Sequence, residues 1–357
     1  MDKENIASVD RSIIDIFTRS LQIASKNPSY IPFLLKTIRA QKKAAKLRRT
    51  FEDGGLHVPP FLIYSITNKC NLKCKGCYAE NHNSNAHNQM SQERKISVLE
   101  EARELGIGVV LLAGGEPLID NDILAVTKDF PEIIFPLFTN GLLINEEIIR
   151  SLKSQKNVIP VVSMEGDMEM TDERRGDGVF KKVSSALRLL KNSGIFYGVS
   201  ITISRSNFDL IINEDFINDL VENGCVLFFL VEYVPVEQGT EALEITQAQR
   251  EKLKKVTAEF SKKFLALFIA FPGSEEEFGG CLAAGRGFLH ISAQGDVEPC
   301  PFSPFSDSNL NNLTLKEALK SELLLKIREN SDMLSEVSSG CSLWKNRDWV
   351  DGLAGEK

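Results

Sequence analysis

Three cysteines stand close together in the segment CNLKCKGC, where Cys70, Cys74 and Cys77 have the spacing C-x3-C-x2-C. No fourth cysteine is nearby, and a structural zinc site normally has four ligands, usually in paired C-x2-C knuckles. An iron–sulfur cluster instead takes a cysteine thiolate on each iron. Three cysteines on a four-iron cluster leave one iron open to another ligand. The spacing therefore predicts an iron–sulfur site with an open coordination position.

A second set of cysteines, Cys281, Cys300 and Cys341, lies in the last quarter of the chain. If these residues also hold a cluster, the fourth ligand is a non-cysteine side chain, a solvent molecule or the substrate. The alternative is three unrelated buried cysteines. His290 lies between the first two, and a lone histidine in the apolar run FLHI is expected to be structural. Cys225 is expected to be a small buried apolar residue.

The elements that position these residues alternate between strand and helix from residue 61 onward. We expect strands at 61–67, 109–113, 133–138, 158–164, 197–203 and 226–231, and helices at 92–105, 119–129, 146–154, 180–191, 214–222 and about 247–263. Such alternation predicts parallel strands with helices outside. Six repeats instead of eight predict an α/β fold with a partial (βα)6 TIM-like barrel. Its chemistry should lie at the carboxyl ends of the strands, where the cysteine loop begins.

Two helices are expected before the barrel, at about 11–25 and 33–49. The second is basic on one side, with Lys36, Arg39, Lys42, Lys43, Lys46, Arg48 and Arg49. This side is either a solvated face of an accessory helix or a contact with a membrane surface or an acidic partner.

The regular alternation of strands and helices ends after about residue 272. Pro272-Gly273 and the acidic run 275–277 are typical of a linker, Gly295-Asp296 of a hairpin turn, and 314–329 of a helix. We therefore expect an N-terminal helical segment at 1–58, the partial barrel at 59–272 and a small α+β iron–sulfur extension at 273–357.

Residues of about 60–265 resemble the radical S-adenosylmethionine (SAM) enzymes. The matching features are the C-x3-C-x2-C loop, the turn Gly114-Gly115-Glu116-Pro117 after the second strand and the six strand–helix units. The resemblance implies that Cys70, Cys74 and Cys77 are the catalytic centre, holding a [4Fe–4S] cluster whose open iron binds SAM. It also implies reductive cleavage of SAM to a 5′-deoxyadenosyl radical, which abstracts hydrogen from a substrate, and a flavodoxin- or ferredoxin-type reductant.

The resemblance also implies the residues that bind SAM. The turn at 114–117 would hold the methionyl amine, Ser163 the ribose and Arg175 the carboxylate, to which an arginine fork is suited. Val234, in the segment EYVP after the sixth strand, is placed near the adenine. Many family members have an aromatic residue just before the third cysteine, where this chain has Gly76 and places Tyr78 after it. A plain turn at 114–117 and a capped loop after Ser163 are the alternative interpretations.

The pattern C-x13-G-x4-C from Cys281 to Cys300 resembles the auxiliary-cluster extension of these enzymes, called SPASM in full and twitch in its short form. With Cys341 it implies one additional [4Fe–4S] cluster at most. An auxiliary cluster is suited to oxidative chemistry, either dehydrogenation or crosslinking. The substrate is a small molecule, a lipid or a peptide, and a SPASM-type maturase of peptides or proteins is the alternative within this family.

The overall composition limits the other functions. The chain of 357 residues has a net charge of −7, which argues against binding nucleic acid. The start MDKEN is polar, no apolar run approaches the roughly 20 residues that span a bilayer, and the seven cysteines are odd in number. We therefore expect a cytoplasmic protein with metal or redox cysteines. The rival classes are a non-enzymatic iron–sulfur electron carrier or sensor and a zinc-structured binding module.

Overall fold

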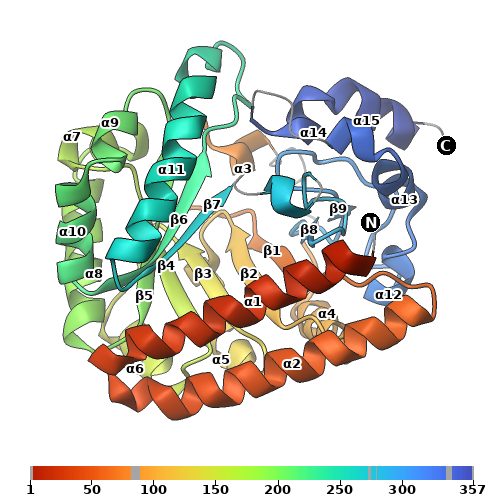
Figure 1. Cartoon of the computed structure of the whole chain (residues 1–357), viewed down its shortest axis with the longest axis horizontal. Coiled ribbons are helices and arrows are strands. Elements are labelled where there is room, and N and C mark those ends of the chain that lie inside the picture. The colour runs from red at the N-terminus through yellow and green to blue at the C-terminus, as the bar shows by residue number, and fades with distance from the viewer. Residues whose placement is uncertain (1–2, 82–88, 272–274, 279, 335–339, 356–357) are drawn as a thin grey trace.

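One open sheet organises the molecule (Figure 1). The computed structural model describes residues 3–81, 89–271, 275–278, 280–334 and 340–355. Within these residues the sheet has nine strands in the order β7-β6-β5-β4-β3-β2-β1-β8-β9. The strands are β1 (Phe61–Thr67), β2 (Val109–Gly114), β3 (Phe135–Thr139), β4 (Val158–Met164), β5 (Tyr197–Ile203), β6 (Cys225–Glu232), β7 (Leu267–Phe271), β8 (Phe288–Ile291) and β9 (Val297–Glu298).

Strands β1 to β8 pair in parallel, and only β9 runs antiparallel, to β8. Parallel strands covered on both faces are buried along their length, and β1, β3 and β5 have few residues that are not buried. The sheet does not close, so the predicted partial barrel is confirmed. It is larger than the six strands expected, because the apolar run LFIAF after the last helix forms β7 and the extension contributes β8.

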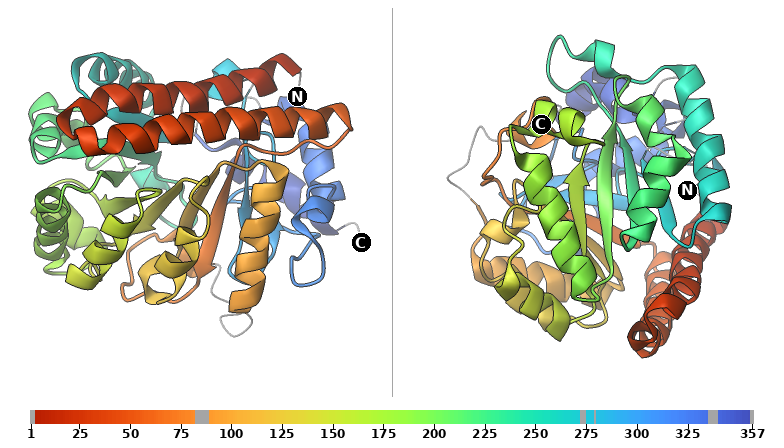
Figure 2. Two further views of the ribbon diagram at one scale, coloured as in Figure 1. Left: turned by 90° about the horizontal axis from the view of Figure 1, so that it is seen from below. Right: turned by 90° about the vertical axis from the view of Figure 1, so that its left-hand side faces the viewer.

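Helices cover the outside of the sheet (Figure 2). In the barrel these are α3 (Tyr78–Asn81), α4 (Gln92–Leu105), α5 (Ile123–Lys128), α6 (Glu146–Ser154), α7 (Met168–Arg175), α8 (Val179–Asn192), α9 (Phe208–Ile211), α10 (Glu214–Glu222) and α11 (Gln247–Lys263). The expected helix 119–129 is shorter, because Pro117–Ile119 forms a 3-10 turn before α5. None of the described helices is long and apolar enough to cross a membrane.

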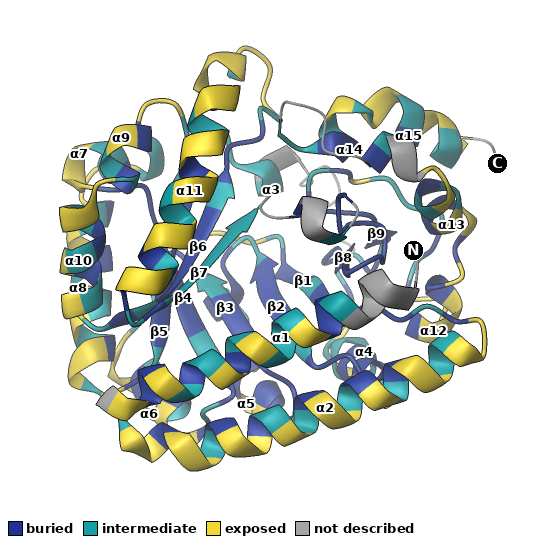
Figure 3. Cartoon of the chain, viewed as in Figure 1, coloured by how far each residue is buried: buried dark blue, intermediate teal, exposed yellow. Residues whose placement is uncertain are grey.

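The N-terminal segment is a pair of long helices, α1 (Lys3–Ile23) and α2 (Ile31–Asp53), which lie side by side across the amino ends of the strands (Figures 1 and 2). The expected second helix is thus longer at both ends. Arg48 does not belong to its basic face: it is buried, forms an ion pair with buried Asp10 on α1 and donates to the Gly106 carbonyl. The other predicted cations are exposed, as the outer face of α2 in Figure 3 shows.

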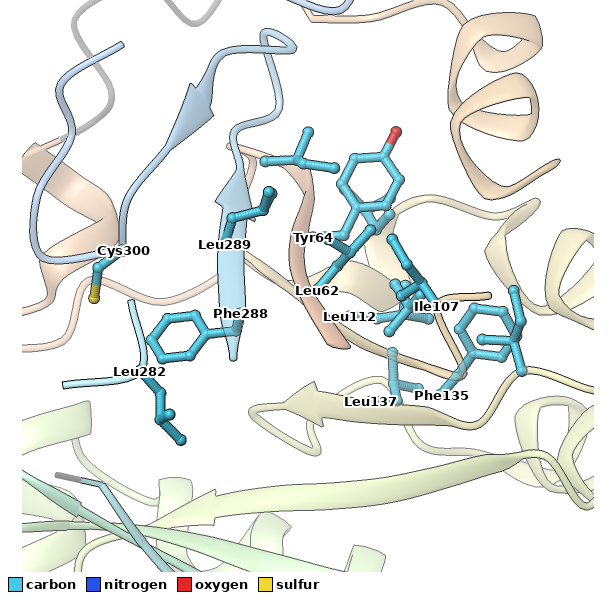
Figure 4. Close-up of a cluster of buried hydrophobic side chains, with 14 of the residues drawn as sticks. Leu62, Tyr64, Ile107, Leu112, Phe135, Leu137, Leu282, Phe288, Leu289 and Cys300 are labelled. Carbon is cyan, nitrogen blue, oxygen red and sulfur yellow. The ribbon is translucent and has the colours of Figure 1, made fainter. Parts of the chain in front are cut away.

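The C-terminal extension packs against the barrel as part of the same core. Figure 4 shows Leu282, Phe288, Leu289 and Cys300 among the buried side chains of β1, β2 and β3. The hairpin predicted at Gly295-Asp296 joins β8 to β9. The predicted helix 314–329 is two helices, because Ser321 caps a new one. The helices of the extension are α12 (Leu315–Ala318), α13 (Glu322–Glu329), α14 (Ser342–Lys345) and α15 (Arg347–Gly355).

The acidic run 275–277, which is expected to belong to a linker, is part of the folded structure. Residues Glu275–Phe278 form a 3-10 turn, and Glu275 is buried. Pro272 and Gly273, the other residues of the expected linker, lie outside the described residues.

Candidate active site

The loop that carries Cys70, Cys74 and Cys77 follows β1 and is held by the ends of neighbouring strands. The Gly115 N–H donates to the Thr67 carbonyl (2.7 Å), and the Glu116 N–H donates to the Lys69 carbonyl (2.8 Å). A Cβ on Gly115 would lie 2.3 Å from the Lys69 oxygen, so only glycine allows this approach. The turn after β2 therefore fixes the first part of the loop.

Asn140, after β3, contacts the same part of the loop. Its side-chain amide donates to the Asn71 Oδ1 (2.6 Å) and approaches the Cys70 Sγ at 4.0 Å. The Leu72 N–H also donates to the Cys70 Sγ (3.4 Å). N–H groups directed at a sulfur stabilise its thiolate form, which is the form that binds a metal.

Glu116 is fully buried and ties the second strand end to the third. Its carboxylate accepts from the Thr139 hydroxyl (2.8 Å), the Asn140 N–H (2.7 Å) and the Leu118 N–H (3.1 Å). Burial raises the pKa of this carboxyl, and the hydrogen bonds oppose the shift. The Glu116 carboxylate thus holds the turn after β2 and the backbone of Asn140 in position.

Two arginines at the end of α7 hold the later part of the loop. The Lys75 N–H donates to the Arg174 carbonyl (2.9 Å), and the Arg174 Nε donates back to the Lys75 carbonyl (3.1 Å). Buried Glu165, at the end of β4, binds both Arg174 (2.6 Å) and Arg175 (2.6 Å). The charges of Glu165 and of the nearby cysteines keep the Arg175 pKa raised despite its burial.

The three thiols of the loop interact electrostatically with one another. Burial raises the pKa of Cys70 and of Cys74, and Arg175 opposes the shift at Cys74. Among the described residues, no three Cys, His, Asp or Glu side chains converge on a point where one metal ion would sit. A cluster does not need this, because each thiolate binds its own iron. Three neighbouring thiols with N–H donors and a cation beside them are a donor set that fits an iron–sulfur cluster.

Gly76, where many family members have an aromatic residue, lies against the ring of Tyr233. A Cβ on Gly76, whose φ is +64°, would lie 2.3 Å from the Tyr233 hydroxyl oxygen. That hydroxyl is buried without a partner among the described side chains, and the ring lies under the Arg174 guanidinium. An aromatic ring is thus present beside the third cysteine, but the residue that follows β6 supplies it. Val234, the next residue, is buried.

Tyr78 links the two sets of cysteines. Its ring packs edge-on against Phe302, with 5.4 Å between centroids. Burial raises the pKa of Tyr78, and the charges of both Cys77 and Cys300 add to the shift. The residue therefore lies between the loop after β1 and the extension.

The second set of cysteines is also assembled by the fold. Cys281, Cys300 and Cys341 interact electrostatically, and burial raises all three pKa values, that of Cys341 to about 11. Glu275 adds to the shift at each of these thiols. Three neighbouring thiols and a carboxylate are a chemically suitable set for a second cluster.

A buried hydrogen-bonded chain crosses the adjoining strands. His290 on β8 contacts the Ser65 hydroxyl on β1 through Nε2 (2.8 Å) and the Glu298 carboxylate on β9 through Nδ1 (2.6 Å). All three side chains are buried. Both ring nitrogens of His290 are thus occupied by protein groups, and the chain joins the extension to the barrel.

The structure brings together most of the residues singled out from the sequence. The cysteine loop, the turn at 114–117 and Arg175 meet at one edge of the sheet, and Ser163, paired with Ser200, lies at the end of β4 on the same edge. The sequence placed Asn140, Glu165 and Tyr233 in motifs at the strand ends but gave them no role of their own, and it gave none to Glu275. The first three were detectable as polar or aromatic residues directly after expected strands, whereas nothing local marks Glu275.

Comparison with known proteins identifies a family model and several relatives that are similar to this chain. Residues 64–207 match the family model described as "Radical SAM superfamily". An AdoMet-dependent heme synthase from Methanosarcina barkeri is 24% identical over 322 residues, covering 80% of this chain and 91% of the relative. The subtilosin biosynthesis protein AlbA from Bacillus subtilis is 26% identical, covering 78% of this chain and 64% of the relative.

The fold resembles solved structures along most of its length. Streptococcus suis SuiB bound to S-adenosylmethionine superposes with a TM-score of 0.65 at 20% identity, covering 87% of this chain and 77% of SuiB. Residues 64–207 thus match the radical SAM superfamily, and the expected resemblance to members with an auxiliary-cluster extension is confirmed. Members of this superfamily use a [4Fe–4S] cluster and SAM, the two cofactors expected from the sequence.

Proposed function

We propose that the protein is a radical SAM enzyme that abstracts hydrogen from its substrate in an oxidative reaction, with Cys70, Cys74 and Cys77 as the cluster ligands. The observation that carries this proposal is the fixed geometry of the cysteine loop, which is bonded to the turn after β2, to Asn140 and to Arg174. When bound, the cluster and SAM supply the radical chemistry, while the protein orients the reactants and excludes water.

The residues around the loop have distinct roles in this proposal. Gly114 and Gly115 are assigned to the methionyl amine of SAM, and Pro117 begins the short 3-10 turn that follows them. Glu116 keeps this turn in position, because its carboxylate is already bound by the chain's own donors. Arg175 is assigned to the SAM carboxylate, since its charge lies beside Cys74.

Three further residues complete the proposed SAM site. Ser163 is assigned to the ribose, because it lies half-buried at the end of β4. Val234 is assigned to the adenine on its position after β6. Tyr78 lies between the two sets of cysteines, so we assign it to the wall between the SAM site and the extension.

The auxiliary cluster of the proposal is held by Cys281, Cys300 and Cys341. Glu275 is the non-cysteine group that we propose as its fourth ligand, because its charge acts on all three thiols. A second cluster can accept the electron that an oxidation releases. The first electron comes from a flavodoxin- or ferredoxin-type reductant, in the cytoplasm, where thiols stay reduced.

Anaerobic reconstitution tests the proposal. The chain should bind about eight irons if both clusters are four-iron cubes, and with dithionite and SAM it should release 5′-deoxyadenosine. An iron–sulfur carrier or sensor would bind iron and change its redox state but would never cleave SAM. Reconstituted protein that binds SAM without cleaving it would therefore contradict the proposed enzyme and favour an iron–sulfur carrier or sensor.

The variant Cys300→Ala separates the two clusters. It should bind about four irons and retain some uncoupled release of 5′-deoxyadenosine, because Cys70, Cys74 and Cys77 remain. Turnover of the substrate should stop. Unchanged iron content would exclude Cys300 as a ligand.

A maturase acting on a peptide or protein is the second candidate. It is favoured by the likeness of the fold to SuiB, which has been solved with its precursor peptide SuiA, and of the sequence to AlbA. The relatives that are AdoMet-dependent heme synthases argue against it, because they match this chain with similar identity and coverage. Deuterium uptake into 5′-deoxyadenosine from labelled candidate substrates would distinguish a peptide from a small molecule.

A further inference from the structure

A cavity of about 260 Å³ lies between the inner face of the sheet and the N-terminal helices. It is lined from the sheet by β1 to β4, β6 and β7 and from the other side by α1 and the start of α2. Representative lining residues are Phe17, Leu111, Ile159, Phe229, Leu267 and Ile269. Figure 1 shows α1 crossing in front of the lower half of these strands.

The wall of this cavity is mostly apolar, and Ser12, Ser20, Tyr30, Lys156 and Glu275 are the residues with polar side chains among those that line it. The Ser20 hydroxyl already donates to the Ile16 carbonyl (2.9 Å). The Lys156 ammonium donates to the Ser29 carbonyl (2.5 Å) and lies 4.8 Å from the ring centroid of Tyr30. A peptide placed here would leave backbone groups without hydrogen-bond partners, which disfavours its binding. A hydrocarbon chain has no such groups.

The cavity extends toward the second set of cysteines. It continues to Phe271 at the carboxyl end of β7 and to Leu282, which follows Cys281. The rings of Phe138, Phe229 and Phe271 pack in series, with centroid distances of 4.9 and 6.0 Å. A chain bound in the cavity would thus run along the inside of the sheet, from the N-terminal helices toward its carboxyl edge.

The surface next to the cavity has the charge that an anionic lipid requires. In a chain of net charge −7, the outer face of α2 exposes Lys36, Arg39, Lys42, Lys43, Lys46 and Arg49. Two large apolar side chains at its start, Ile31 and Leu35, are also exposed, by 36% and 43%. Phe33 and Leu34, from the same turn, line the cavity. Cations and exposed apolar groups on one helix are typical of a contact with an anionic membrane surface.

We propose that this cavity binds the hydrocarbon chain of an anionic membrane lipid and that such a lipid is the substrate class of the enzyme. The second part rests on the proposed function, whereas the first does not. In the reaction, a C–H bond of the chain would break and its hydrogen atom would end in 5′-deoxyadenosine, while SAM releases methionine. The chain radical would then lose an electron to the proposed auxiliary cluster and a proton from the neighbouring carbon, which leaves a carbon–carbon double bond. The electron used to cleave SAM comes from the reductant.

The first experiment measures binding without the chemistry. Reconstituted full-length protein, without reductant, is titrated with 11-(dansylamino)undecanoic acid, and oleate is added as a competitor. We expect saturable fluorescence enhancement that oleate reverses. The variant Ile159→Trp, which fills the cavity, should weaken binding at least about tenfold, or about 1.4 kcal/mol. The smaller change Ile269→Phe should weaken it less.

The matched control is Ile148→Trp, on α6, which makes the same substitution at a half-buried isoleucine outside the cavity lining. It should bind the probe like the wild type. Absence of saturable binding, equal loss in both tryptophan variants, or stronger displacement by a porphyrin or a peptide than by oleate would overturn the inference. Circular dichroism identifies a variant that has not folded, in which case Ile269→Phe decides.

The second experiment tests the lipid as substrate. Vesicles of phosphatidylglycerol with perdeuterated acyl chains are incubated with the reconstituted enzyme, SAM and dithionite. Deuterium in 5′-deoxyadenosine would support the inference. Release of unlabelled 5′-deoxyadenosine alone would overturn the substrate assignment but leave the proposed function intact. A protein that binds the probe but never cleaves SAM would instead contradict the proposed function.

Discussion

At the scale of single residues, the site depends on thiols that differ in their surroundings although all are cysteines. Cys74 is half-buried beside Arg175, which favours its thiolate. Cys225 is buried at the start of β6, its thiol donates to the Leu227 carbonyl (3.4 Å), and burial raises its pKa to about 12. The first environment is typical of a metal ligand and the second of an inert core residue.

These two residues make a matched pair for mutation. Cys74→Ala should abolish release of 5′-deoxyadenosine and lower the iron content from about eight to about four per chain, because one cluster loses a ligand. Cys225→Ala should change neither quantity. Iron analysis and chromatography of the products measure both. Full activity in Cys74→Ala, or loss of iron in Cys225→Ala, would refute the assignment of ligands.

At the scale of elements, the N-terminal helices are joined to the barrel by a buried charge pair. Arg48 of α2 binds both Asp10 of α1 and the carbonyl of Gly106, after α4. Removing one partner of a buried pair leaves the other charge without compensation. The pair therefore fixes α1 over the cavity.

Asp10→Asn should lower the free energy of unfolding by about 3–5 kcal/mol, because Arg48 stays buried and charged. The double variant Asp10→Leu/Arg48→Met should lose less than Asp10→Asn alone, because no charge remains buried. Urea denaturation measures both. A double variant less stable than Asp10→Asn would show that the pair contributes net stability.

The outer face of α2 can be tested separately from the cavity. Replacing Lys36, Lys42, Lys43 and Lys46 with glutamine should reduce flotation with phosphatidylglycerol vesicles, because each cation near an anionic surface contributes about 1 kcal/mol. Flotation of the wild type should fall as salt rises. Replacing four exposed lysines elsewhere, Lys73, Lys153, Lys182 and Lys320, is the control. Equal losses in both variants would show a general effect of charge.

At the scale of the whole molecule, the extension is continuous with the barrel. Strand β8 pairs with β1 over Phe61–Tyr64, and the Ser65, His290 and Glu298 chain adds hydrogen bonds across the same strands. The core shown in Figure 4 runs through both regions. The expected boundary at residue 273 separates two sequence patterns and two sets of cysteines. We propose that the regions on its two sides nevertheless fold as one unit.

The corresponding prediction concerns cooperativity. Unfolding of the apo-protein in urea should give one transition, with the same midpoint for tryptophan fluorescence, which reports Trp344 and Trp349 in the extension, and for circular dichroism, dominated by the barrel. Two separate midpoints would contradict a shared core. Hydrogen exchange of β8 amides should be as slow as that of β1 amides, because both strands lie inside the sheet.

The sequence by itself determined the class of protein, most of the strands and the loop that carries the chemistry. It could do so because buried parallel strands are continuous apolar runs, and because three cysteines within eight residues are close in space in any fold. The run LFIAF of β7 carries the same local signal, although it lies outside the six expected strands.

Only the tertiary structure decided the partners that are remote in the chain. It brought Cys281, Cys300 and Cys341 together with Glu275, placed Tyr233 in the space left by Gly76 and buried Arg48 against Asp10. It also created the apolar cavity, whose walls come from residues 9–34 and 61–282. Such contacts depend on how helices and strands pack against one another. Local spacing and periodicity carry no information about that packing.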